Sequence, residues 1–210
     1  IRALFFDNDG VLVDTERLYY VATHQVLETA GVSLTKEQYV QAILIDGKGA
    51  WHLAAEKGVD AQGIERLRQE RNTIYNSLLE KERIVMDGVQ QVLQSLSGKY
   101  AMGIVTSSLR DHFETIHART GFLKYFEFAI TAGDFSRSKP DAEPYLIALE
   151  RSGVKRDECM VIEDSERGIA SATAAGLKCI VIPNELTREC GFAGAHRILG
   201  HISELPHVLR

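Results

Sequence analysis

The sequence predicts an α/β protein: a doubly wound parallel β-sheet with an all-helical domain inserted after the first strand. Short apolar runs that alternate with helical segments of about 10 to 15 residues are typical of β-α-β units, and therefore of a parallel sheet. Between the first apolar run and the second, residues 16–86 show helical spacing alone. The length of 210 residues, 45% of them hydrophobic, is enough for one sizeable core and a smaller second domain.

The first apolar run, residues 3–6, predicts a buried strand that ends abruptly at Asp7. After it, the pattern predicts helices near residues 18–29, from the capping-box pattern Thr35-x-x-Gln38, at 51–55 and at 61–83. We therefore divide the chain into a core made of residues 1–15 and 87–210 and a helical domain made of residues 16–86.

Strands and helices alternate again from residue 87 onward. Helices are expected at residues 88–96, 109–120, 142–152 and 166–175, and strands at 101–105, 128–131, 159–162 and 178–182. The tail predicts a short strand near Ile198 and a helix over residues 202–209.

Composition excludes several classes of function. The net charge of −5 and the lack of a basic run argue against a nucleic-acid partner. The three cysteines form no C-x-x-C pair, so neither a disulfide framework nor a zinc site is indicated, and a reducing cytoplasm fits best. No apolar stretch approaches 18 residues, so we expect no membrane partner. A monomer or a weak dimer is expected.

Two carboxylates, Asp7 and Asp9, stand at the end of the first strand, and Gly10 follows them. Such a pattern is often only a turn, because Asp and Gly are ordinary turn residues. Carboxylates this close repel each other, and a cation between them relieves the repulsion. Oxygen ligands of this kind favour Mg²⁺. One carboxylate is then available as a nucleophile, as in aspartyl-phosphate chemistry.

Three further strands are followed by polar residues. Taken singly, each group has a structural explanation as a helix cap or a surface turn. All of them fall at the carboxyl ends of strands, where open parallel sheets bind ligands. The residues concerned are Thr106 and Ser107, Lys139, and Glu163 with Asp164.

Together these groups suit a phosphate monoester that approaches Asp7. The Thr106 hydroxyl and backbone N–H groups at a helix start can hold phosphoryl oxygens. Lys139 offsets negative charge, and Asp164 completes an oxygen site for Mg²⁺. Asp9 can act as general acid toward the leaving group and then as general base toward water.

Four segments carry a resemblance to the haloacid dehalogenase superfamily, in the branch with a helical cap after the first strand. They are DNDGVLVDTE (7–16), VTSS (105–108), KPDAEPY (139–145) and IEDSERGIASATAAG (162–176). The resemblance covers roughly residues 3–182, in the family's order and spacing. It implies a Rossmann-like core and a cap domain of the kind seen in beta-phosphoglucomutase-like and phosphatase-like members.

The resemblance implies roles for the first segment. Asp7 resembles the nucleophile that forms an aspartyl-phosphate and also binds Mg²⁺. Asp9 resembles the acid/base residue, which lends its main-chain carbonyl to the metal. Residues 10–14 resemble the flap that couples cap and core. An acid at Asp9 favours phosphoryl transfer over dehalogenation. Asn8 stands where relatives often carry an apolar residue.

The other segments receive roles in the same way. Thr106, with Ser107, and Lys139 resemble the phosphate-binding residues. Asp164 resembles the third metal-site carboxylate, and Glu163 resembles a ligand or its neighbour. Ala142 departs from the K-P-x-P pattern of many relatives, which affects only a loop.

In the predicted cap, the Gly-rich segment 46–52 carries Lys48, a candidate contact for the non-phosphate end of a substrate or, alternatively, a solvated turn residue. Outside this segment the histidines, His117 among them, show no ligand-like spacing and are expected to be structural or on the surface.

We expect a Mg²⁺-dependent phosphatase that acts on a small phosphorylated metabolite, such as a sugar or polyol phosphate. Three alternatives stay open. A sugar phosphomutase would use the same aspartyl-phosphate but needs a cap that excludes water. A phosphonate hydrolase would use a cap lysine as a Schiff base, for which Lys48 is a weak candidate. A non-enzymatic phospho-acceptor domain is disfavoured by the nucleophile on the first strand and by the large helical insert.

Overall fold

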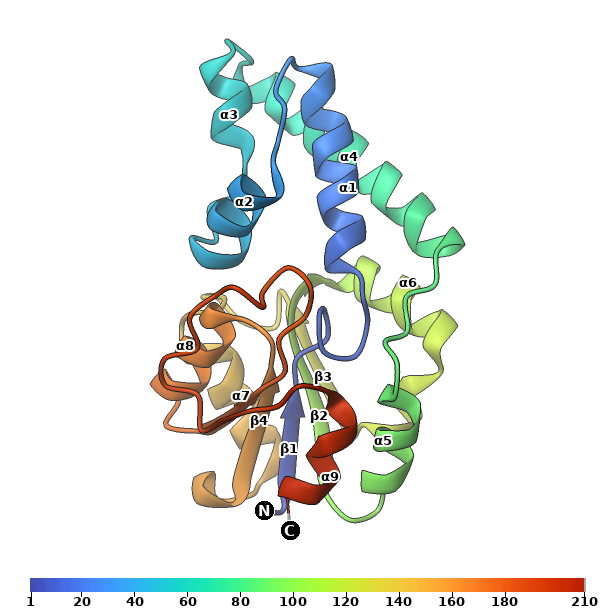
Figure 1. The fold of residues 1–210 in the computed structure, drawn as a ribbon, viewed down its shortest axis with the longest axis vertical. Coiled ribbons are helices and arrows are strands. Elements are labelled where there is room, and N and C mark those ends of the chain that lie inside the picture. Colours follow the sequence, from blue (N-terminus) through green and yellow to red (C-terminus); the bar gives the residue numbers. More distant parts are fainter. Residues whose placement is uncertain (210) are drawn as a thin grey trace. The chain divides into compact units, whose positions relative to one another are not determined.

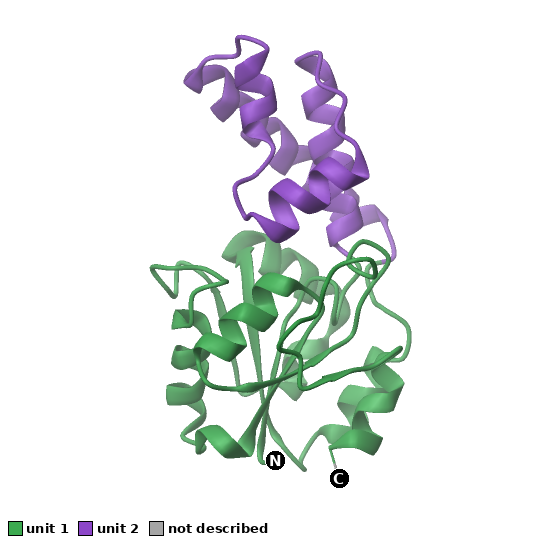
Figure 2. Ribbon diagram, turned by 60° about the vertical axis from the view of Figure 1, so that its left-hand side comes forward, with its two compact units in different colours: residues 1–14, 84–210 green, residues 15–83 purple. Residues whose placement is uncertain are grey.

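A computed structural model describes residues 1–209, which fall into two compact units (Figure 2). Unit 1 combines residues 1–14 with the chain from Ile84 onward, and unit 2 comprises residues 15–83. The sequence-based division set its boundaries after residues 15 and 86. Arg210, the last residue of the predicted core, lies outside the described residues.

Unit 1 is built on a parallel sheet, which confirms the predicted fold class. The described residues form six strands in the order β3-β2-β1-β4-β5-β6, and every pairing is parallel. β1 lies in the middle, where both neighbours protect it. The strands are β1 (Ala3–Phe6), β2 (Ala101–Leu109), β3 (Phe128–Ala132), β4 (Cys159–Glu163), β5 (Lys178–Val181) and β6 (Arg197–Ile198).

Helices cover both faces of this sheet. Figure 1 shows α7 and α8 on one face and α5 and α6 on the other, with α9 beside α5. The bounds are α5 (Val89–Leu96), α6 (Arg110–Thr120), α7 (Glu143–Ser152), α8 (Glu166–Ala174) and α9 (Leu205–Val208). Short 3₁₀ turns occupy Phe122–Tyr125, Arg156–Glu158 and Ile202–Glu204.

The alternation of side chains along β1 decides what lies on each face. Ala3 and Phe5 belong to the apolar cluster that includes Tyr145 of α7 and Ile169 of α8. Every residue of β1 is fully buried, so the intervening side chains pack against the opposite layer. The same alternation sends Asp7 toward the α7 and α8 face and Asn8 toward the α6 face.

The predicted end of β2 at residue 105 is wrong. The strand continues to Leu109, with an irregular register between Val105, opposite Ile130, and Leu109, opposite Ala132. α6 begins only at Arg110, and no side chain caps it. The Thr-Ser-Ser segment resembles a helix cap in sequence, but β3 holds the chain in the sheet.

Unit 2 is helical, as predicted for this part of the chain. Its elements are α1 (Glu16–Thr29), α2 (Lys36–Tyr39), a π-helical turn (Val40–Ile45), α3 (Trp51–Glu56) and α4 (Ala61–Lys81). The predicted capping box is confirmed, since Thr35 and Gln38 exchange side-chain to backbone hydrogen bonds. Asp60 caps α4 by accepting from the backbone N–H of Gly63.

Aromatic contacts join the helices of unit 2. The rings of Tyr19 on α1 and Tyr75 on α4 meet edge to face, with centroids 5.1 Å apart. The guanidinium of Arg71, which is buried, lies 4.2 Å from the Tyr19 ring centroid and 5.5 Å from that of Trp51. Among the described residues, no helix has the length and apolar character that a membrane crossing requires.

Gly103 in β2 leads to a test of the packing between strands. A Cβ atom at this position would lie 2.3 Å from Cε2 of the Phe128 ring. We expect Gly103→Ala to lower the free energy of unfolding by about 1–3 kcal/mol, because the ring must move out of a packed layer. Urea unfolding followed by circular dichroism measures this change. The control Gly191→Ala, whose Cβ would have its nearest contact at 3.6 Å, should leave the free energy of unfolding nearly unchanged. If both variants lost the same free energy of unfolding, the close contact between Gly103 and Phe128 would not be the cause.

Candidate active site

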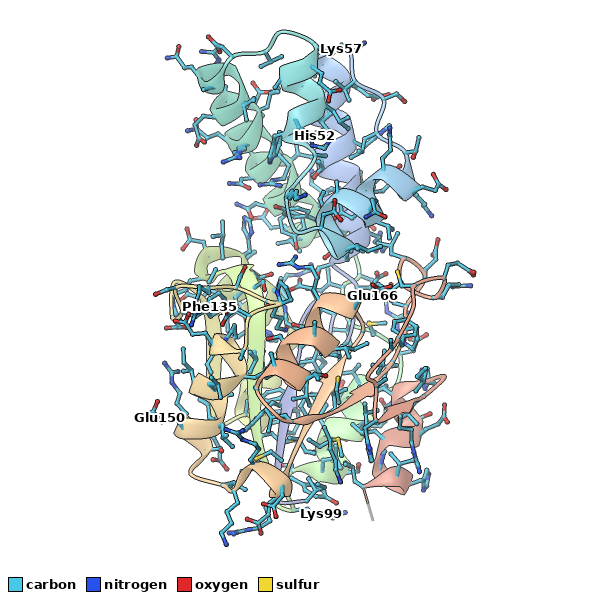
Figure 3. All side chains as sticks on the ribbon, turned by 90° about the vertical axis from the view of Figure 1, so that its left-hand side faces the viewer. His52, Lys57, Lys99, Phe135, Glu150 and Glu166 are labelled. Atoms are coloured by element: carbon cyan, nitrogen blue, oxygen red, sulfur yellow. The ribbon has the colours of Figure 1, made fainter. Side chains whose placement is uncertain are left out.

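The predicted site residues of the core gather at the carboxyl edge of the sheet. Figure 3 labels Phe135, in the loop after β3, and Glu166, at the start of α8, at this end of unit 1, whereas Lys99 lies at the opposite end. β1 and β4 end here, beside the middle of β2 and the loop that carries Lys139. The following contacts show which side chains touch.

Lys139 is buried, with 5% of its surface exposed, and joins three strands. Its Nζ donates to Asp7 Oδ1 and to Glu163 Oε1, both at 2.6 Å, and to the main-chain oxygen of Val105 at 2.8 Å. These acceptors match the three donors of an ammonium group. Burial by itself would lower the pKa of Lys139, but Asp7 and Glu163 outweigh it and raise that pKa above its ordinary value. The lysine is therefore a fixed cation.

Glu163 is fully buried and holds Lys139 in place. Its Oε1 also accepts from the hydroxyl of Tyr145 at 2.6 Å. Its Oε2 accepts from the backbone N–H of Asp164 and from the Ser165 hydroxyl, both at 3.3 Å. α8 approaches so closely that a Cβ atom at Gly168 would lie 1.9 Å from the Glu163 carboxyl, which explains the glycine.

Asp7 has its pKa raised to about 8. Burial is the largest cause, and Glu163 and Asp9 add to it, while Lys139 acts in the opposite direction. The raised pKa therefore reflects mainly the loss of water around this carboxyl. A further cation beside it would lower this pKa and favour the ionised form.

Asp164 is held by a residue that sequence reasoning missed. Asn184, after β5, donates from Nδ2 to Asp164 Oδ2 at 2.6 Å. The Asn184 side-chain oxygen accepts from the backbone N–H groups of Leu186 and Thr187, which fixes the amide in a turn. Gly10, with φ of +85°, makes room, since a Cβ there would lie 2.2 Å from Asp164 Oδ2. The sequence signal that could have found it is an Asn with a Thr three residues later, in the turn that follows Pro183 after β5.

A divalent cation fits this group. Asp7, Glu163 and Asp164 each offer an oxygen atom, and these atoms lie within 4.8 Å of one another. All three side chains are buried, and the ligand atoms are all oxygens, the type that hard cations prefer. Lys139 supplies one positive charge to three carboxylates, so a divalent ion would balance the cluster.

Asp9 has a different environment, built from hydroxyl and amide donors. Its Oδ2 accepts from Ser108 Oγ at 2.7 Å, Thr106 Oγ1 at 3.1 Å and Asn8 Nδ2 at 3.3 Å. Ser108 was not among the predicted site residues, whereas the predicted Ser107 is exposed. Thr106 is buried, and its oxygen also accepts from the Ser108 backbone N–H. The two acids two residues apart therefore occupy separate groups of contacts.

Lys48 belongs to unit 2, where it is exposed. It lies on a turn in which Gly47 and Gly49 both have positive φ. The backbone N–H groups of Lys48 and Gly49 both donate to the carbonyl of Ala42. These bonds give the turn a defined backbone within its own unit.

Comparisons with known proteins identify relatives along the whole chain. The family model described as haloacid dehalogenase-like hydrolase matches residues 4–182. The putative phosphatase YhcW of Bacillus subtilis is 30% identical over 100% of this chain and 96% of its own length. A phosphorylated carbohydrates phosphatase of Thermotoga maritima is 29% identical over 86% of this chain and 84% of its own length. The crystal structure of CbbY from Rhodobacter sphaeroides in complex with phosphate has a TM-score of 0.82 at 23% identity, and the match covers 98% of this chain and 96% of that one.

The raised pKa of Asp7 predicts how metal binding depends on pH. The folded pKa of about 8 exceeds the ordinary value of 3.8, so the folded protein binds this proton more tightly than the unfolded chain does. Without a metal, this group therefore lowers the free energy of unfolding as the pH rises toward about 8. A metal ion displaces the proton, so Mg²⁺ should raise Tm more at pH 8 than at pH 6.

Thermal unfolding with and without MgCl₂ measures this difference. When the MgCl₂ concentration is about 100 times the dissociation constant of the metal complex at pH 8, we expect Tm to rise by about 5–10 °C at that pH. Asp164→Ala should remove most of the increase, whereas Asp157→Ala, at an exposed carboxylate, should retain it. A larger increase at pH 6 than at pH 8 would refute the link to Asp7.

Proposed function

Because this chain belongs to the haloacid dehalogenase-like hydrolase family, we propose that it is a Mg²⁺-dependent phosphatase that hydrolyses a small phosphorylated metabolite through an aspartyl-phosphate on Asp7. One observation carries the proposal: two neighbouring acids lie in contrasting environments. Asp7 contacts the Lys139 ammonium within a group of buried carboxylates, whereas Asp9 contacts hydroxyl and amide donors. A divalent cation beside Asp7 would hold it ionised as the nucleophile, which leaves Asp9, outside the group of buried carboxylates, for proton transfer.

In the first half of the reaction, the Asp7 carboxylate attacks the phosphorus of the monoester. A bond forms between the Asp7 oxygen and phosphorus, and the bond from phosphorus to the ester oxygen breaks. Asp9, protonated at this stage, gives its proton to the departing oxygen, which leaves as an alcohol. Lys139, 2.6 Å from Asp7, favours the ionised nucleophile.

In the second half, Asp9 acts as a base. It removes a proton from a water molecule while the water oxygen attacks the aspartyl-phosphate. The bond between phosphorus and the Asp7 oxygen breaks, which releases inorganic phosphate and restores the Asp7 carboxylate. Asp9 ends in its protonated form, ready for the next ester.

We assign the metal site to Asp7, Asp164 and the main-chain carbonyl of Asp9. When bound, Mg²⁺ supplies positive charge that offsets the phosphate and the carboxylates. Glu163 lies in the same carboxylate group, but its two oxygens already accept four hydrogen bonds. A carboxylate has about four acceptor positions, so we assign Glu163 mainly to holding Lys139.

Phosphate binding is assigned to Thr106 and Lys139, with the neighbouring Ser107. The Thr106 hydroxyl, within β2, lies 3.1 Å from Asp9 Oδ2, so it can stabilise phosphoryl oxygens near both acids. Lys139 provides the positive charge. Ser107 is exposed beside Thr106 and offers a hydroxyl or a backbone N–H.

The substrate class follows from the relatives rather than from the site. The name of the Thermotoga maritima relative supports a sugar or polyol phosphate. We assign catalysis to residues 1–15 and 87–210 and a cap that selects the substrate to residues 16–86, where Lys48 is a candidate contact. The three cysteines are free thiols, which supports the cytoplasmic location proposed from the sequence.

A sugar phosphomutase is the second candidate, since it would use the same Asp7 intermediate. The two relatives compared by sequence above are both named phosphatases, which favours hydrolysis. A screen of phosphorylated sugars, polyols and nucleotides separates the two. Release of inorganic phosphate supports hydrolysis, whereas conversion between sugar phosphates without release of phosphate supports a mutase.

Asp7→Asn tests the nucleophile. With p-nitrophenyl phosphate and MgCl₂, we expect kcat to fall at least about 1,000-fold, because an amide oxygen cannot form the covalent intermediate at a useful rate. Absorbance of released p-nitrophenol measures turnover. Asp157→Asn, at an exposed carboxylate, serves as the control and should keep wild-type activity. Full activity of Asp7→Asn would exclude the covalent mechanism.

Asp9→Ala tests the acid/base role. We expect kcat to fall about 100- to 10,000-fold, the usual range for loss of a general acid or base. The Mg²⁺-induced increase in Tm should persist, because the proposed ligand at this position is the main-chain carbonyl. Unchanged kcat would remove Asp9 from proton transfer, and loss of the increase in Tm would show that its carboxylate binds the metal.

A further inference from the structure

A buried polar chain lies behind Asp9, on the α6 face of β1. Asn8 is fully buried, and its Oδ1 lies 2.9 Å from Nε2 of His117 on α6. His117 is 3% exposed, and its Nδ1 lies 2.9 Å from Oγ1 of Thr120. Asn8 Nδ2 in turn donates to Asp9 Oδ2. The chain thus connects the end of α6 to the proposed acid/base residue.

The donors in this chain all point in one direction. Asp9 Oδ2 accepts from Thr106 and Ser108, so the Asn8 group that faces it is assigned as the NH₂ donor. Asn8 Oδ1 then faces His117 and needs a donor, which assigns the imidazole proton to Nε2. His117 Nδ1 is left as an acceptor for the Thr120 hydroxyl.

The surroundings of His117 keep the imidazole neutral. Burial lowers its pKa to about 4, although Asp9 acts in the opposite direction. The Phe113 ring packs beside it, with centroids 4.4 Å apart. A neutral imidazole has one donor and one acceptor, and both are satisfied here.

We propose that Asn8 and His117 are positioning residues that orient the Asp9 carboxylate for proton transfer, with His117 acting only through Asn8. The proposal rests on the proposed function, because it assumes that Asp9 exchanges a proton with the leaving group and with water. Asn8 adds a donor from the protein interior to those of Thr106 and Ser108, so Asp9 Oδ2 is held from more than one side.

A general acid that is misplaced should affect poor leaving groups most. Phenol is a much weaker acid than p-nitrophenol, so phenyl phosphate needs the proton from Asp9 more than p-nitrophenyl phosphate does. The two esters have nearly the same size. The readout is therefore kcat/KM for phenyl phosphate divided by kcat/KM for p-nitrophenyl phosphate, measured with MgCl₂. A change that merely loosens the fold lowers both values together and leaves this ratio unchanged.

The variants remove or retain the donor to Asn8. His117→Leu removes it, and we expect the ratio to fall at least about 10-fold, a part of the usual contribution of a general acid. His117→Gln retains an N–H donor near the position of Nε2 and should stay within about 3-fold of wild type. The matched control is His112→Leu, a second buried histidine of α6, which should leave the ratio unchanged.

A double-mutant cycle tests whether His117 acts through Asn8. Asn8→Leu alone should lower the ratio at least about 10-fold, and adding His117→Leu should lower it no further. Thr120→Val removes the hydroxyl that meets His117, together with the acceptor for the backbone N–H of Phe122, and should lower the ratio by about 3-fold. If Asn8→Leu or His117→Leu does not unfold cooperatively, the ratio measured for Thr120→Val tests the positioning role instead.

Equal losses with both esters, an unchanged ratio in Thr120→Val, or additive effects in the double variant would overturn the positioning role. So would a loss in His117→Gln as large as that in His117→Leu. These results leave the proposed function intact, because the wild type still hydrolyses both esters. A wild type that hydrolyses no phosphate monoester overturns the proposed function first, and the positioning role with it.

Discussion

The site depends on one buried ammonium group. Lys139 Nζ ties together three strands through Asp7 after β1, the Val105 carbonyl within β2 and Glu163 at the end of β4. A buried charge is tolerated only when it is paired and its hydrogen bonds are satisfied, and here three acceptors meet three donors. Other features of the fold serve this contact, including the Tyr145 hydroxyl and the missing side chain of Gly168. Removal of either carboxylate would leave the lysine buried with too little negative charge.

The two acids of the first strand differ because the strand alternates its faces. Asp7 emerges on the face covered by α7 and α8, where Lys139 and Glu163 lie. Asn8 emerges on the α6 face and meets His117. Asp9, in the turn that follows, contacts Thr106 and Ser108 of β2. One short segment therefore supplies a carboxylate beside a cation, a buried amide and a carboxylate among neutral donors.

The carboxylate group brings more negative charge together than Lys139 balances, and the fold holds it there by rigid local structure. Asn184 fixes Asp164 through a turn, and Gly10 leaves the space that the two side chains occupy. Such a site is stable only because surrounding donors and packing hold the carboxylates against their mutual repulsion. The excess of acid over base makes a divalent cation a natural occupant.

Sequence patterns were enough to predict the parallel sheet, the helical insert and the edge of the sheet at which the polar residues gather. Hydrophobic periodicity indicates which segments form buried strands. The carboxyl ends of parallel strands share one edge of the sheet, so the polar residues there were expected to lie together. These residues are Asp7, Thr106, Lys139 and Asp164. Local patterns could not show that β2 continues to Leu109, since pairing with β3 holds that segment.

The hydrogen-bond partners of each side chain could be seen only in the folded protein. Ser108, Asn184 and His117 join the site through contacts between residues far apart in the chain, 109 positions in the case of Asn8 and His117. A histidine on an amphipathic helix looks the same in sequence whether it meets an apolar neighbour or a buried amide. Hydrogen-bond partners depend on which strands and helices become neighbours, and hydrophobic periodicity does not reveal which side chains these elements bring together.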